Sequence, residues 1–128
     1  MRFLQNEVNL HTHSYYCRHG EGEIKDYVSV ARKKGLLKVL GFSEHAPLPD
    51  KKLYYGTRME YSDLDRYERD VRLSDEEGGI KVLLGAECDW IKDEVGFYRE
   101  ELLGDRGYSY LLGSVHSMVS PETGLDTY

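Results

Sequence analysis

Four short apolar segments recur along the chain, and polar loops and helical patterns separate them. The segments are residues 8–10, 36–42, 80–84 and 108–112. Each has the length of one buried strand, and the stretches between the first, second and third are long enough to hold a helix. Strands that alternate with helices predict an α/β fold with a parallel sheet, built from βαβ units with right-handed crossovers.

Three helical patterns lie between these segments. In residues 23–31 the apolar side chains recur at the spacing of one helix face, and Gly35 follows as a candidate C-terminal cap. Ser62 is a candidate N-cap for a second helix, which is expected to run to about residue 76. A third helical stretch is expected near residues 98–103.

The composition is that of one folded domain. Of the 128 residues, 40% are hydrophobic and 31% are charged, so a core can form. No apolar run approaches the roughly 18 residues needed to span a bilayer, so no membrane partner is expected. The formal net charge of −6 disfavours nucleic acid as a partner, because phosphate contacts need basic patches. Cys17 and Cys88 are expected to be reduced thiols in a cytoplasmic protein.

All five histidines lie at the carboxyl ends of the expected strands or in the loop just after one. The first apolar segment is followed by three of them, the second by one, the third by a glutamate and the fourth by one: His11, His13 and His19, then His45, Glu87 and His116. Active sites of parallel α/β folds form at that edge of the sheet. The sequence therefore predicts that four successive strands bring these side chains to one rim.

The residue types at this rim suit a metal centre. His11 and His13 are two positions apart, and side chains at i and i+2 point to the same face of a strand. Imidazoles together with a carboxylate suit Zn, Fe or Mn. Five histidines and one glutamate are too many for a single four-coordinate ion, so a site with several ions is expected.

Each of these residues also has a structural interpretation when it is taken alone. A single His-x-His pair is weak evidence, and His116 can be a partly buried residue bonded to backbone. Glu87 can pair with a Lys or Arg. Cys17 is read as a small buried residue and Glu44 as a supporting carboxylate. The joint pattern of the five histidines is what favours metal binding.

Four motifs carry a resemblance to a known family. They are, in chain order, HTHSYYCRHG, GFSEHAPLP, GAECDW and GSVHSM. In this order and spacing they resemble the first four motifs of the polymerase-and-histidinol-phosphatase (PHP) superfamily, and the first two look most like its histidinol-phosphate phosphatase branch. The resemblance covers essentially the whole chain. It implies that residues 1–128 are the N-terminal portion of a PHP domain, with about four βα units of a distorted, TIM-like (β/α)7 barrel that is incomplete in this chain.

The resemblance also implies a ligand set and a reaction. Six residues would hold up to three divalent ions: His11 and His13 the first, Glu87 as a bridge to a second that His116 also binds, and His19 and His45 the third. The implied reaction is hydrolysis of the phosphomonoester L-histidinol phosphate in histidine biosynthesis. The ions would lower the pKa of a bridging water, so that hydroxide forms at neutral pH, and would neutralise the phosphoryl oxygens. No protein nucleophile is needed.

Part of the family pattern is expected to lie beyond this chain. Barrels of this kind need about 200 residues or more. A further His ligand, an Asp-x-His and the arginines that clamp the phosphate are all expected downstream. Within the chain, Arg18 and Arg58 lie in rim loops and are the candidate substrate contacts. Because four strands cannot close a barrel, we expect a homo-oligomer or a missing C-terminal half to cover the open edge.

Three functions therefore compete. The first is a metal-dependent phosphatase of the histidinol-phosphate type, with a small-molecule phosphomonoester as its substrate. The second is another PHP-type phosphoesterase, and the third is a non-catalytic half-barrel that binds metal and self-associates. The amidohydrolases also place His-x-His after their first strand, but His19 and the Ser-Glu-His motif fit the PHP pattern better.

Overall fold

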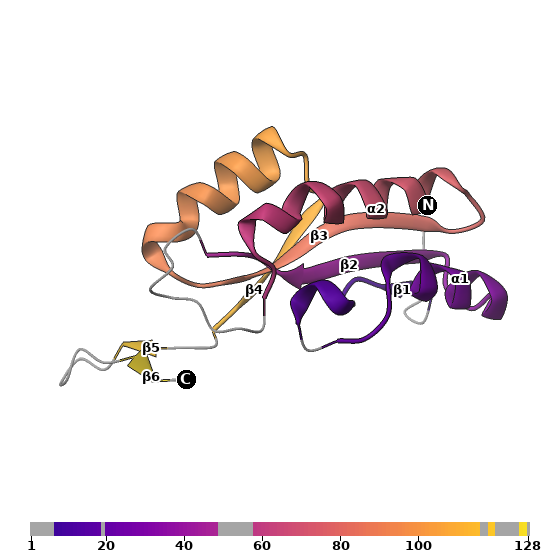
Figure 1. Cartoon of the computed structure of the whole chain (residues 1–128), viewed down its shortest axis with the longest axis horizontal. Helices are drawn as coiled ribbons and strands as arrows, with labels where there is room; N and C mark the ends of the chain where they lie inside the picture. Colours follow the sequence, from indigo (N-terminus) through magenta and orange to yellow (C-terminus); the bar gives the residue numbers. More distant parts are fainter. Residues whose placement is uncertain (1–6, 19, 49–57, 116–117, 120–125, 128) are drawn as a thin grey trace.

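Four parallel strands in chain order, β1-β2-β3-β4, form the sheet (Figure 1). The computed structural model describes residues 7–18, 20–48, 58–115, 118–119 and 126–127. The strands are β1 (Val8–Asn9), β2 (Val39–His45), β3 (Lys81–Asp89) and β4 (Tyr110–Ser114). A separate antiparallel pair, β5 (Met118–Val119) and β6 (Asp126–Thr127), follows them. The predicted parallel α/β sheet is confirmed.

The helices join successive strands, and all three contribute buried side chains to the core that they share with the sheet. The connections are α1 (Ile24–Lys34) between β1 and β2, α2 (Leu64–Glu76) between β2 and β3, and the π-helix η6 (Phe97–Asp105) between β3 and β4. Apolar side chains from α1, α2, β2 and β3 are buried together: Ile24, Val28 and Ala31, then Leu64, Tyr67 and Val71, then Leu40 and Phe42, then Val82, Leu84 and Ala86. The helices therefore cover one face of the sheet and leave the other face for the site.

Helix ends follow the sequence expectation at one cap and depart from it at another. α1 is capped by Gly35, whose φ of 67° lies in the left-handed region that favours glycine. Ser62 is not an N-cap, because it lies inside a short 3-10 turn, Tyr61–Asp63. A reciprocal capping box between Glu60 and Asp63 satisfies the backbone N–H groups there instead.

β2 and β3 run further toward their carboxyl ends than the apolar segments indicate. β2 continues to His45 and β3 to Asp89. The two strands pair in parallel up to these ends, with His45 opposite Glu87. Backbone pairing between β2 and β3 thus extends both strands to polar residues. It also fixes the directions of the His45 and Glu87 side chains.

One tyrosine crosses the face of the sheet opposite the helices. Tyr110 on β4 lies over Gly85 and Gly41, where an added Cβ would collide with its ring and hydroxyl. Its hydroxyl donates to the carbonyl oxygens of Leu10, at 2.6 Å, and Phe42, at 3.1 Å. Since Leu10 directly precedes His11, this side chain ties β4 to the point where β1 ends.

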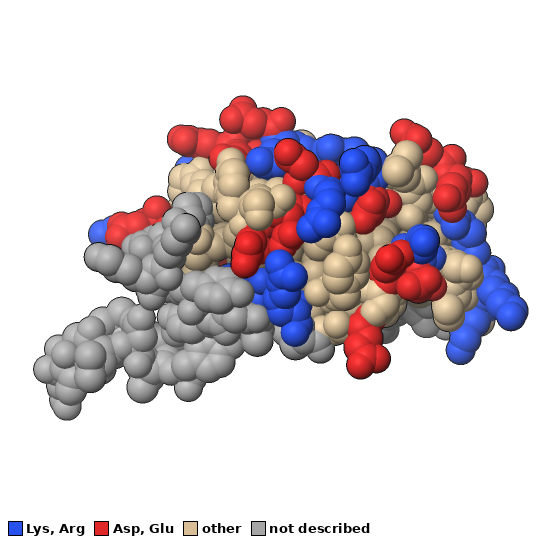
Figure 2. Space-filling view, viewed as in Figure 1, with Lys and Arg blue, Asp and Glu red and all other residues tan. Residues whose placement is uncertain are grey.

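The surface carries charge of both signs. On the face shown in Figure 2, acidic and basic side chains are interspersed among uncharged ones. Among the described residues, no helix combines the length and the apolar character that crossing a membrane requires.

Candidate metal centre

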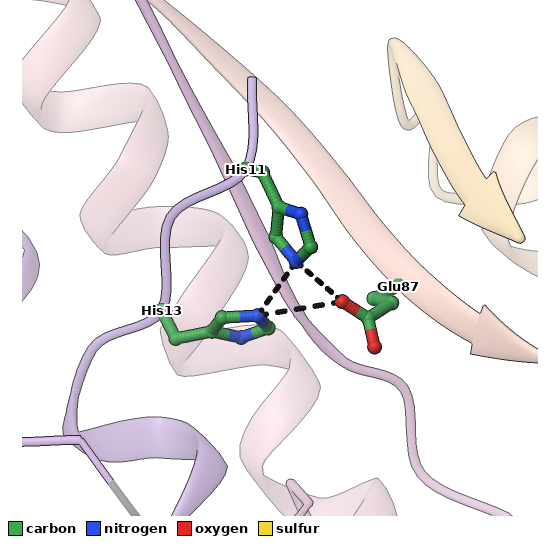
Figure 3. A group of neighbouring side chains, drawn as sticks. All are labelled: His11, His13 and Glu87. Atoms are coloured by element: carbon green, nitrogen blue, oxygen red, sulfur yellow. Dashed lines mark hydrogen bonds and ion pairs between the residues drawn. The ribbon is translucent and has the colours of Figure 1, made fainter. Parts of the chain in front are cut away.

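Three potential ligand atoms converge at the carboxyl ends of β1 and β3 (Figure 3). His11 Nε2 lies 2.5 Å from Glu87 Oε1 and 3.1 Å from His13 Nε2. His13 Nε2 lies 3.4 Å from the same Glu87 oxygen. Because β1, β2 and β3 are neighbours in the sheet, residues 76 positions apart in the sequence meet at one rim.

β2 positions the His-x-His segment from the side. The Thr12 backbone N–H donates to Ser43 Oγ at 3.2 Å, and the Ser43 backbone N–H donates to the Thr12 carbonyl at 2.9 Å. The backbone between the two histidines therefore remains attached to β2 after β1 has ended. This attachment keeps both imidazoles on the side of Glu87.

His45 joins the same cluster through the other oxygen of Glu87. His45 Nδ1 lies 3.1 Å from Glu87 Oε2. The His13 and His45 rings are stacked, with centroids 4.5 Å apart. Glu87 is buried, with one oxygen toward His11 and His13 and the other toward His45. A carboxylate that faces two sets of imidazoles in this way has the geometry of a bridging group.

The cluster lines an open hollow of about 510 Å³. Its other wall is the end of β4, at Leu112, Gly113 and Ser114. His11 is the most exposed of the four polar residues, with 60% of its side chain accessible, whereas the Glu87 side chain is 6% accessible. The hollow is in the size range of small-ligand sites, and its three imidazoles and its carboxylate lie on one wall.

The donor set and its spacing fit a divalent metal ion. Tetrahedral zinc with bonds of 2.0–2.1 Å places its ligand atoms about 3.3 Å from one another. The His13 nitrogen lies 3.1 Å and 3.4 Å from its two neighbours, so two of the three separations are already close to that value. The 2.5 Å between His11 and Glu87 is a direct hydrogen-bond length and would have to open.

The electrostatics of the cluster favour a positive charge between its members. Burial alone lowers the pKa of His13, but hydrogen bonds to Cys17 and Glu44 outweigh it and raise that pKa to about 10. A metal-bound imidazole must give up the proton on its bonded nitrogen. A divalent ion would therefore replace that proton as the charge that compensates the buried carboxylates Glu44 and Glu87.

The two candidate arginines are both held by carboxylates. Arg58 is 2% exposed, and it donates to Asp89 Oδ2 at 2.6 Å and to the Ala46 carbonyl at 3.0 Å. Arg18 is partly exposed and donates to Asp63 Oδ2 at 2.7 Å. Arg58 thus links the ends of β2 and β3 in this structure. A role of either arginine in binding substrate stays a prediction.

Two predicted ligands, His19 and His116, lie outside the described residues. The sequence interpretation did not single out Ser14, Asp89 or Tyr110, which support the rim through hydrogen bonds. Asp89 had a detectable signal, because it follows Glu87 by two positions and so shares its face of β3. Ser14 and Tyr110 had none, because their partners are distant in the sequence.

Comparisons with known proteins agree with this fold. The family model of the PHP domain matches residues 9–127. The chain therefore belongs to the PHP domain family. A "Probable histidinol-phosphatase" of Deinococcus radiodurans is 32% identical over 110 residues, which are 83% of this chain and 40% of that protein. A protein of the same name from Schizosaccharomyces pombe is 27% identical over 88% of this chain and 40% of its own length.

A solved structure shows the same fold in a longer chain. The crystal structure of a candidate histidinol phosphatase from Listeria monocytogenes superposes with a TM-score of 0.72 and 19% identity, over 93% of this chain and 47% of the other. The sheet and its helices therefore match part of a TIM-like barrel, as predicted. The chain spans less than half the length of each of these proteins.

Proposed function

We propose that this chain carries part of the active site of a metal-dependent phosphomonoester hydrolase of the histidinol-phosphate phosphatase type. The observation that supports this proposal best is the convergence of His11 Nε2, His13 Nε2 and Glu87 Oε1 at the carboxyl rim. The names of the two curated relatives point to the same substrate. Hydrolysis of L-histidinol phosphate is therefore the reaction to test first.

The proposed ligands are the six that the family resemblance implies. His11, His13, His45 and Glu87 belong to the described cluster, and His19 and His116 complete the set. When bound, divalent ions lower the pKa of water and neutralise charge on phosphoryl oxygens. The protein groups hold the geometry: β2 fixes the His-x-His backbone, and Glu87 presents one oxygen to each side of the cluster. The open hollow leaves room for a small phosphate ester.

The test combines metal content with substrate turnover. Protein purified without chelator is measured by elemental analysis, and phosphate release is followed with histidinol phosphate, a phosphotyrosine peptide and single-stranded DNA. We expect bound Zn, Fe or Mn and a preference for histidinol phosphate. A Glu87→Gln variant should lose both metal and activity, and Glu68→Gln, at a buried carboxylate on α2 beside Arg106, should keep both. A chain without bound metal would contradict the proposal.

A second candidate is a metal-binding half-barrel that self-associates without turnover. Within the described part of the chain, β4 pairs only with β3, so its other edge is open. An open edge is a template for pairing with another chain. Light scattering combined with metal analysis separates the two: an oligomer that binds metal but releases no phosphate from any ester favours this second function.

A further inference from the structure

We propose that Glu44 is a positioning residue that holds the His13 ring in the orientation required for metal binding, an inference that rests on the proposed metal site. Glu44 lies on β2 next to His45 but on the other face of the strand, and its side chain is fully buried. Its Oε1 lies 3.5 Å from His13 Nδ1. Glu44 is therefore placed behind the metal cluster, on the side of His13 that Glu87 does not occupy.

The two ring nitrogens of His13 face different carboxylates. Nε2 lies 3.4 Å from Glu87 Oε1, and Nδ1 faces Glu44. A neutral imidazole carries one N–H, and the nitrogen without it offers the lone pair. A carboxylate beside Nδ1 favours the proton on that nitrogen, which leaves Nε2 as the ligand atom. Partners of this kind orient metal-binding histidines and increase their basicity.

Glu44 is itself fixed by Ser14, the residue that follows His13. The Ser14 backbone N–H donates to Glu44 Oε1 at 2.8 Å, and the Ser14 hydroxyl donates to Oε2 at 2.6 Å. The Cys17 thiol donates to the Ser14 carbonyl at 3.0 Å. Both oxygens of Glu44 are thus attached to the segment that carries His13. Such a rigid arrangement can set the direction of a ring.

A purely structural role for Glu44 is the competing explanation. In that case Glu44 would only satisfy the Ser14 N–H and hydroxyl, and the nearness of His13 would be incidental. Glu68 provides a matched comparison, because it is also a buried carboxylate and accepts a hydrogen bond from Tyr108 at 3.0 Å. Its partners among the described residues, Arg106 and Tyr108, lie on the segment between η6 and β4, away from the histidine cluster.

The decisive measurement is metal affinity in Glu44→Gln and Glu68→Gln. Dissociation constants for Zn²⁺ and Mn²⁺ are determined by competition with a chromogenic chelator, and unfolding of the metal-free proteins is measured in parallel. We expect Glu44→Gln to bind about 10–100-fold more weakly than the wild type, and Glu68→Gln to bind like the wild type. Wild-type affinity in Glu44→Gln would overturn the role of Glu44. Failure of the wild-type chain itself to bind metal would instead overturn the proposed site.

A measurement on the wild-type chain keeps the inference testable if Glu44→Gln does not fold. Nitrogen-15 NMR of the metal-loaded protein reports which ring nitrogen of each histidine is protonated and which is bound. We expect His13 to carry its proton on Nδ1 and to bind metal through Nε2. Coordination through Nδ1, or a proton on Nε2, would contradict the proposal.

Discussion

His45 and Glu87 stand opposite each other in the parallel register of β2 and β3, and His45 Nδ1 lies 3.1 Å from Glu87 Oε2. The other oxygen of Glu87 faces His11 and His13. Glu87 is therefore the carboxylate in this cluster that contacts imidazoles from both the loop after β1 and the end of β2.

Replacing Glu87 should remove more metal than replacing His45. Glu87→Gln takes a negative charge away from both sides of the cluster, whereas His45→Ala removes one imidazole and leaves the other three residues in place. We expect Glu87→Gln to weaken binding by more than the roughly 10–100-fold that loss of a supporting partner costs. Elemental analysis of both variants, purified in parallel, tests this. Equal metal content in the two proteins would exclude a bridging role for Glu87.

Adding a methyl group at Gly85 should destabilise the sheet, because the new Cβ would meet the Tyr110 ring. We expect Gly85→Ala to lower the free energy of unfolding by about 1–3 kcal/mol, the usual cost of overpacking. Gly113→Ala on β4 is the matched control, because nothing lies within 4 Å of its added Cβ. Denaturant unfolding of both variants measures the difference. If both lose the same stability, strand propensity and not the Tyr110 contact explains the effect.

The fold was predictable because its two central strands, β2 and β3, are largely buried and therefore appear in the sequence as short apolar segments. The positions at which β2 and β3 end could not be predicted in the same way. His45 and Glu87 belong to strands because β2 and β3 pair with each other, and no local pattern records that pairing. Similarly, Ser62 has a side chain suited to an N-cap, but Glu60 and Asp63, on either side of it, form the capping box instead.

The candidate ligands could be predicted because strand order alone brings strand ends to one rim. The residues that support the rim could not, because each depends on a contact between distant segments. Ser14 and Glu44 are 30 positions apart, and Arg58 and Asp89 are 31 apart. The sequence made Arg58 a candidate substrate contact at the rim, and the structure shows it in a buried ion pair with Asp89.

Replacing Arg58 should therefore affect the stability of the fold more directly than it affects catalysis. Removing one partner of a buried ion pair leaves the other charge uncompensated, which typically costs about 3–5 kcal/mol. We expect Arg58→Met to lose stability of this order, and Arg58→Met combined with Asp89→Asn to recover part of the loss. Thermal unfolding of the single and double variants checks this. A stable Arg58→Met protein with weaker substrate binding would instead favour the predicted phosphate contact.

The buried Tyr108 should make the protein less stable at alkaline pH. Burial, together with the charge of Glu68 and the hydrogen bond to it, raises the pKa of Tyr108 well above its ordinary value of 10.0. Because the folded chain holds the proton more tightly than the unfolded chain, the stabilising contribution is complete below pH 10 and is lost as the pH rises above it. One pH unit corresponds to about 1.4 kcal/mol, so Tyr108 should account for about 1.4 kcal/mol of lost stability at pH 11. Unfolding of the wild type and Tyr108→Phe at pH 8 and 11 isolates this contribution, since the variant lacks the hydroxyl. Parallel losses in the two proteins would mean that Tyr108 does not titrate with unfolding.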